Sequence, residues 1–256
     1  MNNLLDLSGR VALVTGGSRG LGKEMALAFA DHGADVIVAS RKFDNCQAVA
    51  QQIEARGRQA LPYACHVGQW EQIQGLVDAA YDRFGRVDVL VNNAGLSPLY
   101  PSLVDISEEL FDKVIALNLK GPFRLSALIG TRMAAGEGGS IINVSSTAAV
   151  TPSPSAEPYG AAKAGLNALT RSFAYAYGPN VRVNSIMAGP FLTDISKAWD
   201  MERFNERART AIPLQRGGQP SEIVGAALYL ASAASSYTTG SIMAVDGGCQ
   251  GNRMLE

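Results

Sequence analysis

The sequence predicts an α/β fold in which a doubly wound parallel sheet of about seven strands carries helices on both faces. Short β-branched runs alternate along the chain with longer stretches of helical pattern, which is typical of strand–helix–strand units. The strand runs are apolar without alternation, as expected where helices cover both faces of a sheet. Seven strands in one sheet would use nearly all of the chain, which predicts a single domain over residues 1–256.

The expected strands cover residues 10–15, 35–39, 59–64, 88–91, 140–144, 182–186 and 241–245. Because crossovers between parallel strands are right-handed, the chain should wind outward on both sides of a switch point. The expected helices cover residues 21–32, 44–56, 70–84, 108–135, 159–177 and 221–231. The least regular stretch, residues 191–213, is expected to be a substrate lid or simply a long surface connection.

Composition and charge exclude several classes of function. The chain is 47% hydrophobic and 18% charged, and its 22 basic and 23 acidic residues give a net charge of −1. It lacks the basic excess that nucleic-acid binding needs, and its apolar runs are shorter than the ~18 residues of a membrane span. No positive charge precedes the short apolar stretch at the N-terminus, which argues against a signal peptide. We therefore expect a soluble, cytoplasmic protein with neither nucleic-acid nor membrane partners.

Metal-ligating residue types are scarce. The three cysteines, Cys46, Cys65 and Cys249, fit no metal motif, and His32 and His66 are the two histidines of the chain. A zinc-dependent dehydrogenase would need a cluster of such ligands. No metal site is expected.

A glycine-rich loop joins the first expected strand to the first expected helix. Gly16, Gly20 and Gly22 allow a tight turn and a close approach of backbone amides to a pyrophosphate. The helix that follows would present unpaired N–H groups and the positive end of its dipole to that anion. The strand before and the helix after this loop favour a dinucleotide site over a turn without a ligand.

The end of the second strand bears on which dinucleotide is bound. An NAD site usually places a carboxylate there to bond the ribose 2′-hydroxyl, but this chain has Ser40. Arg41 and Arg19 could both bind a 2′-phosphate. This favours NADP(H) over NAD(H), the alternative being that Arg41 and Lys42 form a solvated charge pair.

Tyr159 and Lys163 stand four residues apart, and so on one face of an expected helix. Carbonyl reduction needs a proton at oxygen while a hydride reaches carbon. The pKa of free tyrosine is about 10, and a nearby ammonium, together with the positive charge of an oxidised nicotinamide, would lower it. Such a pair occurs by chance on many helices, so the motifs around it decide whether it is interpreted as catalytic.

That context resembles the short-chain dehydrogenase/reductase family. The motif TGxxxGxG at residues 15–22, Asn-Asn-Ala-Gly at residues 92–95 and the tyrosine–lysine pair carry the resemblance, which extends over almost the whole chain. It implies a Rossmann-like fold and a homotetramer or homodimer. It also implies that Tyr159 acts as general acid/base.

The resemblance further implies partners for the tyrosine. Ser146, 13 residues before Tyr159, would bind the substrate oxygen, with Ser145 as the alternative. Asn118 would sit at a helix kink and hold a water that relays protons to Lys163. The catalytic set is then Asn118, Ser146, Tyr159 and Lys163.

The cofactor-binding set implied by the resemblance spreads over several loops. His66 stands where the family usually has an aspartate that bonds the adenine amine, so His66 would stack on or bond the adenine, or the contact would be weaker. Thr193 would meet the nicotinamide amide, although Ala188 replaces the usual proline of that segment. The full set is Gly16, Ser18, Arg19, Gly20, Leu21, Gly22, Ser40, Arg41, His66, Val67, Asn93, Ala94, Gly95, Tyr159, Lys163, Gly189, Pro190 and Thr193.

The sequence therefore predicts an NADP(H)-dependent enzyme that interconverts a ketone or aldehyde and an alcohol. One alternative is a 3-oxoacyl-[acyl-carrier-protein] reductase, for which Lys120, Arg124 and Arg132 would offer a basic patch to an acidic carrier. Another is a binding protein that senses NADP(H) without catalysis. The expected substrate pocket is moderately hydrophobic and is lined by Leu96, Leu99, Tyr100, Val150, Pro152, Phe191 and Trp199.

Overall fold

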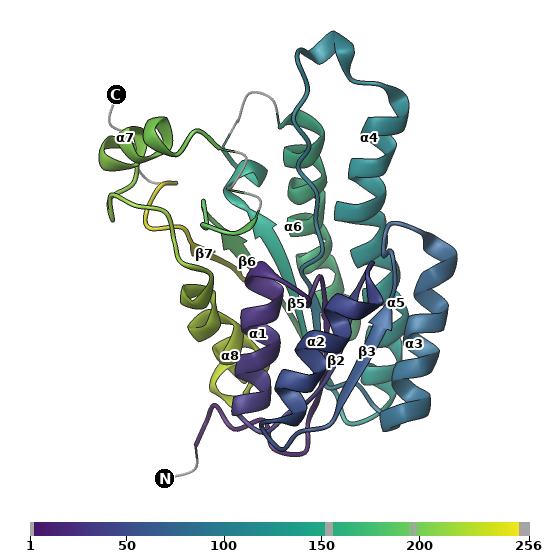
Figure 1. Ribbon diagram of the computed structural model, residues 1–256. Coiled ribbons are helices and arrows are strands. Elements are labelled where there is room, and N and C mark those ends of the chain that lie inside the picture. The colour runs from purple at the N-terminus through teal and green to yellow at the C-terminus, as the bar shows by residue number, and fades with distance from the viewer. Residues whose placement is uncertain (1–2, 152–155, 195, 197–198, 251–256) are drawn as a thin grey trace.

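The computed structural model describes residues 3–151, 156–194, 196 and 199–250. Its centre is a seven-stranded parallel sheet in the order β3-β2-β1-β4-β5-β6-β7, which confirms the predicted fold class (Figure 1). The strands are β1 (Val11–Thr15), β2 (Asp35–Ser40), β3 (Ala60–Ala64), β4 (Val89–Asn92), β5 (Gly139–Ser146), β6 (Val181–Ala188) and β7 (Ile242–Val245). The winding direction reverses between β1 and β4, where a crevice for a ligand is expected.

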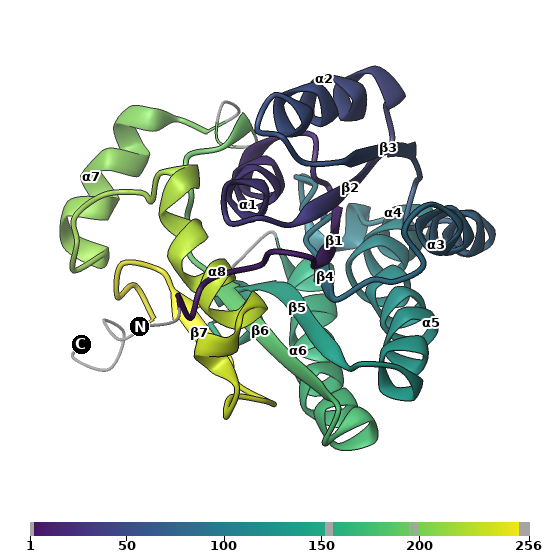
Figure 2. The same cartoon turned by 90° about the horizontal axis from the view of Figure 1, so that it is seen from below.

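Helices cover both faces of the sheet (Figure 2). One face carries α1 (Gly20–Asp31), α2 (Phe43–Glu54) and α8 (Val224–Ala231), and the other carries α3 (Trp70–Phe84), α5 (Gly121–Ala135) and α6 (Glu157–Tyr177). Alternate strand residues point to opposite faces, so Val14 packs into the first core and Leu13 into the second. Both side chains are fully buried, which explains why the strand sequences are apolar throughout.

The expected helix 108–135 is interrupted in its middle. It begins as α4 (Glu108–Ile115), whose cap is the Ser107 hydroxyl that accepts from Leu110 N at 3.1 Å, and it continues as α5. Between them lies η2 (Ala116–Lys120), one turn of π-helix that contains Asn118. Short π-helical turns often mark functional sites.

The stretch 191–213 contains a helix that sequence patterning did not predict, α7 (Met201–Ala211). The Asp200 carboxylate caps it by accepting from Arg203 N at 3.0 Å. Residues 195, 197 and 198 of this stretch lie outside the described part of the chain. In Figure 1, α7 and α4 stand on opposite sides of the carboxyl ends of the strands. Other short helical turns among the described residues are η1 (Leu103–Asp105), η3 (Thr147–Ala149), η5 (Pro220–Ile223) and η6 (Ala233–Ser235).

Candidate active site

The glycine loop lies between β1 and α1 and is fixed from the neighbouring strand β4. Gly16 and Gly20 have φ values of +63° and +52°, which a residue with a side chain adopts only with strain. The Asn93 amide donates to Thr15 O at 2.9 Å, and a Cβ on Gly22 would lie 2.3 Å from Gly16 O. The backbone thus makes a compact cradle at the start of α1, as a bound pyrophosphate requires.

Hydroxyl and cationic side chains border this cradle at the end of β2. Ser18 Oγ donates to Ser40 Oγ at 2.9 Å, which joins the glycine loop to the second strand. Arg19 and Arg41 are both exposed. The described residues at this point therefore combine hydroxyls with two free-standing guanidinium groups, a set that fits an additional phosphate.

Asn118 is fully buried and bridges the π-turn to the segment after β4. Its Nδ2 donates to Leu96 O and Val114 O at 2.9 Å each, while its Oδ1 accepts from Leu96 N at 3.2 Å. A Cβ placed on Gly95 would lie 2.9 Å from Asn118 Oδ1 and 3.7 Å from Lys163 Nζ. Asn118 and Lys163 therefore border the same small space, which glycine keeps open.

Lys163 is buried on α6, and its ammonium donates to Val144 O at 2.8 Å. Burial lowers the pKa of Lys163 to about 8. The ammonium lies 5.7 Å from the centroid of the Tyr159 ring. The tyrosine and lysine thus share one helix face, as their spacing predicts.

The pKa of Tyr159 differs from the sequence-based expectation. Burial raises this pKa, and a hydrogen bond with Ser146 partly opposes the rise. The expected lowering by Lys163 is not seen, because the ammonium bonds a strand carbonyl instead of the phenol. A positive charge closer to the phenol would be needed to lower it.

The two serines at the end of β5 have different environments. Ser145 is buried, and its hydroxyl donates to Lys163 O at 3.4 Å. Ser146 is half-buried, accepts from Ala148 N at 3.2 Å and lies close enough to the Tyr159 hydroxyl to oppose the rise of its pKa. This favours Ser146 over Ser145 as the group that meets a substrate oxygen.

The segment after β6 closes over the glycine loop. A Cβ placed on Gly20 would lie 3.5 Å from Thr193 Cγ2, so the Thr193 side chain lies beside the glycine loop. A Cβ on Gly189 would lie 2.6 Å from Asp246 Cα, which keeps this turn tightly packed against the end of β7. Pro190 and Gly189 also line a hollow of about 200 Å³ beside this turn.

His66 follows β3 at the same edge of the sheet. Its Nδ1 accepts from Gly68 N at 3.1 Å, and the ring is partly exposed. Val67 is buried, and its carbonyl packs against Gly121, where a Cβ would lie 2.1 Å from the oxygen. The strands β3, β2, β1 and β4 are neighbours in the sheet. The predicted cofactor residues that follow these strands therefore lie in a row along the carboxyl ends of the strands.

The expected hydrophobic substrate residues are only partly brought together. Leu99 and Val150 are strongly exposed and Phe191 is buried, whereas Pro152 lies outside the described residues. Trp199 packs on Phe204 of α7 with ring centroids 5.1 Å apart. These contacts place Trp199 with α7 rather than with the serine and tyrosine.

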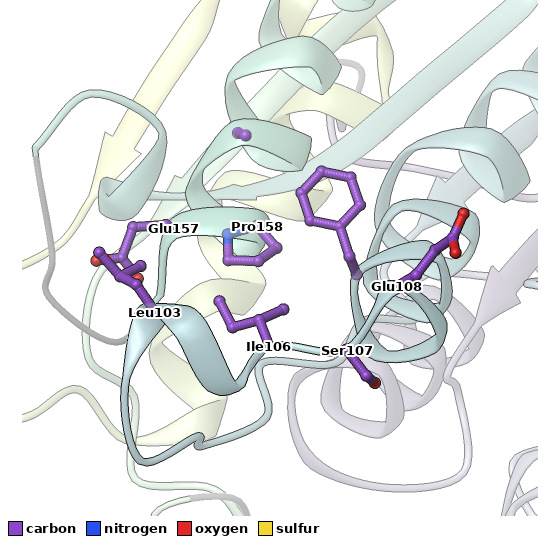
Figure 3. Close-up of a pocket in the computed structure, with 8 residues that line it drawn as sticks. Leu103, Ile106, Ser107, Glu108, Glu157 and Pro158 are labelled. Carbon is purple, nitrogen blue, oxygen red and sulfur yellow. The ribbon is translucent and has the colours of Figure 1, made fainter.

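A larger hollow of about 560 Å³ lies at the start of α6 but does not include Tyr159 (Figure 3). In the view of Figure 3, Ile106 faces Pro158, and Ser107 and Glu108 lie at the start of α4. Its lining residues are Leu103, Ile106, Ser107, Glu108, Phe111, Glu157, Pro158 and Ala161. The hollow is therefore distinct from the predicted catalytic set.

Two further residues support the site in roles that were not predicted. Thr15 Oγ1 accepts from Asn93 N at 3.0 Å and Ala94 N at 3.2 Å, and it donates to Val91 O at 3.0 Å. The Tyr100 hydroxyl accepts from Glu157 N at 2.9 Å and bonds the Glu157 carboxylate. Thr15 belongs to the glycine motif and could have been noticed there, but nothing local in the sequence singles out Tyr100 for this contact.

The described residues hold neither a metal-binding cluster nor a membrane-spanning helix. Within those residues, His, Cys, Asp and Glu form no group of three or more that could hold a metal ion. None of the helices there is both long enough and apolar enough to cross a membrane.

Comparisons with known proteins agree with this geometry. The chain matches a family model described as Enoyl-(Acyl carrier protein) reductase over residues 16–250. It is 37% identical over 243 residues to the 3-oxoacyl-[acyl-carrier-protein] reductase of Thermotoga maritima, a match that covers 94% of this chain and 98% of that protein.

Two solved structures are similarly close. A 7α-hydroxysteroid dehydrogenase complexed with NADH and 7-oxo glycochenodeoxycholic acid has a TM-score of 0.92 and 35% identity, covering 97% of this chain and 98% of that one. A gluconate 5-dehydrogenase from Burkholderia cenocepacia J2315 in complex with NADP and tartrate has a TM-score of 0.92 and 30% identity, with coverage of 97% and 98%. This chain is therefore an oxidoreductase of the short-chain dehydrogenase/reductase family.

Proposed function

We propose that this protein is an NADP(H)-dependent enzyme that interconverts a ketone or aldehyde and an alcohol, with Tyr159 as general acid/base. The observation that carries the proposal is the position of the Ser146 side chain beside the Tyr159 hydroxyl, whose pKa it acts to lower, with the Lys163 ammonium 5.7 Å from the centroid of the tyrosine ring. A carbonyl oxygen needs a hydrogen-bond donor and a proton source on the same side. Ser146 and Tyr159 supply these two groups.

Each residue of the set has a separate task. When bound, the nicotinamide cofactor supplies or accepts the hydride. The Tyr159 hydroxyl gives its proton to the developing alkoxide in reduction and takes it back in oxidation. Ser146 donates to the same oxygen and orients it. Lys163, buried and held by Val144 O, lies one helical turn from Tyr159, and together with Asn118 it borders the space that Gly95 keeps open.

The preference for NADP(H) rests on Ser40, Arg41 and Arg19. The hydroxyl pair of Ser18 and Ser40 presents no negative charge to a 2′-phosphate, and both arginines are exposed at this point. The relatives themselves use either cofactor, since one is complexed with NADH and another with NADP. The proposed preference for NADP(H) over NAD(H) therefore rests on the residues at the end of β2 and in the glycine loop.

The activity of a 3-oxoacyl-[acyl-carrier-protein] reductase, by analogy with the Thermotoga maritima relative, is the second candidate. Its expected basic patch is largely committed to internal contacts: Arg124 lies 4.8 Å from the Trp70 ring centroid, and Arg132 pairs with Asp78 at 3.2 Å. These partners belong to α3, which packs beside α5 on one face of the sheet. The simple carbonyl reductase is therefore the better-supported proposal.

Cofactor oxidation with NADPH and NADH in parallel, against a panel of ketones, β-ketoesters and acyl-carrier thioesters, tests the proposal. We expect faster turnover with NADPH, and a loss of roughly 10²–10⁴-fold in kcat for Tyr159→Phe. Cofactor binding by this variant, measured by calorimetry, should be nearly unchanged.

Three other outcomes would change the assignment. Equal or better use of NADH would overturn the interpretation of Ser40, Arg41 and Arg19. Preference for carrier thioesters would favour the second candidate. Tight NADPH binding without turnover of any substrate would favour a sensing protein.

A further inference from the structure

His66 lies where the base of a bound dinucleotide is expected, an inference that rests on the proposed function. A pyrophosphate at the start of α1 and a ribose at the end of β2 leave the base further along the same edge, towards β3. Ser40 and Ala64 are register partners at the ends of β2 and β3, and His66 follows two residues later. Its side chain is therefore a candidate contact to the base.

The hydrogen bond from Gly68 N fixes the tautomer of the His66 ring. A backbone N–H can only donate, so Nδ1, which accepts it at 3.1 Å, carries no proton. In the neutral ring the proton must then sit on Nε2, which becomes a donor. A carboxylate in the same turn would accept this amide too, but its second oxygen would remain an acceptor.

The turn also fixes the orientation of the ring. A Cβ on Gly68 would lie 2.9 Å from His66 Cε1 and 3.1 Å from Nδ1, so only glycine lets the ring lie against this turn. The backbone of His66 is held on both sides, since its N–H donates to Gln72 Oε1 at 2.8 Å and its carbonyl accepts from Gln69 N at 2.7 Å. Within the described residues Nε2 has no acceptor, and the ring is partly exposed.

We propose that His66 contacts the purine of the cofactor as a hydrogen-bond donor through Nε2–H. Adenine offers a donor at its 6-amino group and acceptors at its ring nitrogens, whereas hypoxanthine offers an acceptor, a carbonyl oxygen, at position 6. A carboxylate bonds the amine and repels the carbonyl oxygen. A donor bonds the carbonyl oxygen or a ring nitrogen, so this protein accepts a cofactor with a 6-oxo purine.

Binding measurements without substrate test this specificity. Dissociation constants of NADPH and of its hypoxanthine analogue, deamino-NADPH, are measured by calorimetry for the wild type, His66→Asp and His66→Asn. In the wild type we expect the analogue to bind within about threefold of NADPH or more tightly. In His66→Asp the analogue should bind about tenfold or more weakly than NADPH, a difference of about 1.4 kcal/mol.

His66→Asn is the matched control for the turn. An asparagine oxygen can accept from Gly68 N, as Nδ1 does, while its amide nitrogen remains a donor. This variant should therefore keep the wild-type tolerance of the analogue. Thermal unfolding of all three proteins shows that the turn and the fold are intact.

The possible failures are distinguishable. If the wild type binds NADPH but binds the analogue at least tenfold more weakly, or if His66→Asp does not change the ratio, the role of His66 is overturned and the proposed function stands. If the wild type binds neither NADPH nor NADH, the proposed function fails, and the role of His66 fails with it.

Discussion

At the scale of single residues, Lys163 is a site residue whose buried charge lowers the stability of the folded protein. The residue is 3% exposed, and its ammonium donates to one strand carbonyl, Val144 O. Burial makes the charged form costly, which lowers the pKa of Lys163 from 10.5 to about 8. A purely structural position would hold an apolar side chain, so the lysine is best explained by the chemistry of Tyr159.

Replacement of Lys163 by Met should stabilise the protein at pH 7. Below pH 8 the lysine is charged in both the folded and the unfolded state, so the folded wild type bears the full burial penalty, at most roughly 3 kcal/mol. Between pH 8 and about 10.5 the unfolded chain retains the proton that the folded chain releases, and the stability of the wild type rises with pH. Urea unfolding at pH 7 and pH 10 should thus show a larger advantage of Lys163→Met at pH 7.

The control for this experiment is Lys113→Met, since Lys113 is exposed on α4. Its effect on the free energy of unfolding should be small and equal at both pH values. If Lys163→Met gives the same difference from wild type at pH 7 and pH 10, the ammonium is not buried as described.

At the scale of elements, the first turn of α6 has to hold Tyr159 in place. The Tyr100 hydroxyl ties the segment after β4 to this turn by accepting from Glu157 N at 2.9 Å and by bonding the Glu157 carboxylate. Glu157 lies two residues before Tyr159. Tyr100 is thus a positioning residue rather than a catalytic one.

Removal of this hydroxyl in Tyr100→Phe should lower kcat several-fold, because the helix start loses a backbone partner worth about 1 kcal/mol. Cofactor affinity should not change, since Tyr100 does not border the glycine cradle. Tyr175→Phe makes the same chemical change on α6 itself, at a side chain that is 91% exposed, and should leave kcat unaltered. An equal effect of both variants on kcat would contradict the positioning role.

Elements differ in how far the sequence predicts them. The strands and α1, α3 and α6 were predicted within a few residues because each buries an apolar stripe or run. α7 was not predicted, because most of its residues are polar and Ala208 is its one buried residue. The polar residue Asn118 inside a helix pointed to the interruption at η2, although not to its π-helical geometry.

At the scale of the whole molecule, the carboxyl ends and the amino ends of the parallel strands have different roles. The predicted catalytic and cofactor residues follow the carboxyl ends of the strands, as expected in a doubly wound fold. The sequence could place many of them there because their motifs follow strand ends, whereas Asn118, Tyr159 and Lys163 lie on helices. It could not predict the contact of Tyr100 with Glu157, the tautomer of His66 or the direction in which the pKa of Tyr159 shifts. These depend on the three-dimensional contacts of each side chain.

The amino ends of the central strands carry a polar cluster that stabilises the fold. Asp88, at 4% exposure, accepts from Val11 N at 2.9 Å and pairs with Arg10 at 3.0 Å and with Arg86. It joins the starts of β1 and β4, the two strands between which the winding direction reverses. This cluster therefore holds the centre of the sheet at the end remote from Tyr159.

Replacement of Asp88 by Ala should separate folding from catalysis. The buried Val11 N–H and Arg10 lose their partner, and Arg86 keeps only Glu137, so the free energy of unfolding should fall by about 3 kcal/mol. Asp31→Ala is the control, because its ion pair with Arg56 at 2.8 Å is exposed and should be worth less than about 1 kcal/mol. Below the unfolding transition, kcat/KM should match the wild type for both variants. A loss of kcat/KM in folded Asp88→Ala would mean that the spacing of β1 and β4 at their amino ends also sets the geometry of the glycine cradle and of Gly95.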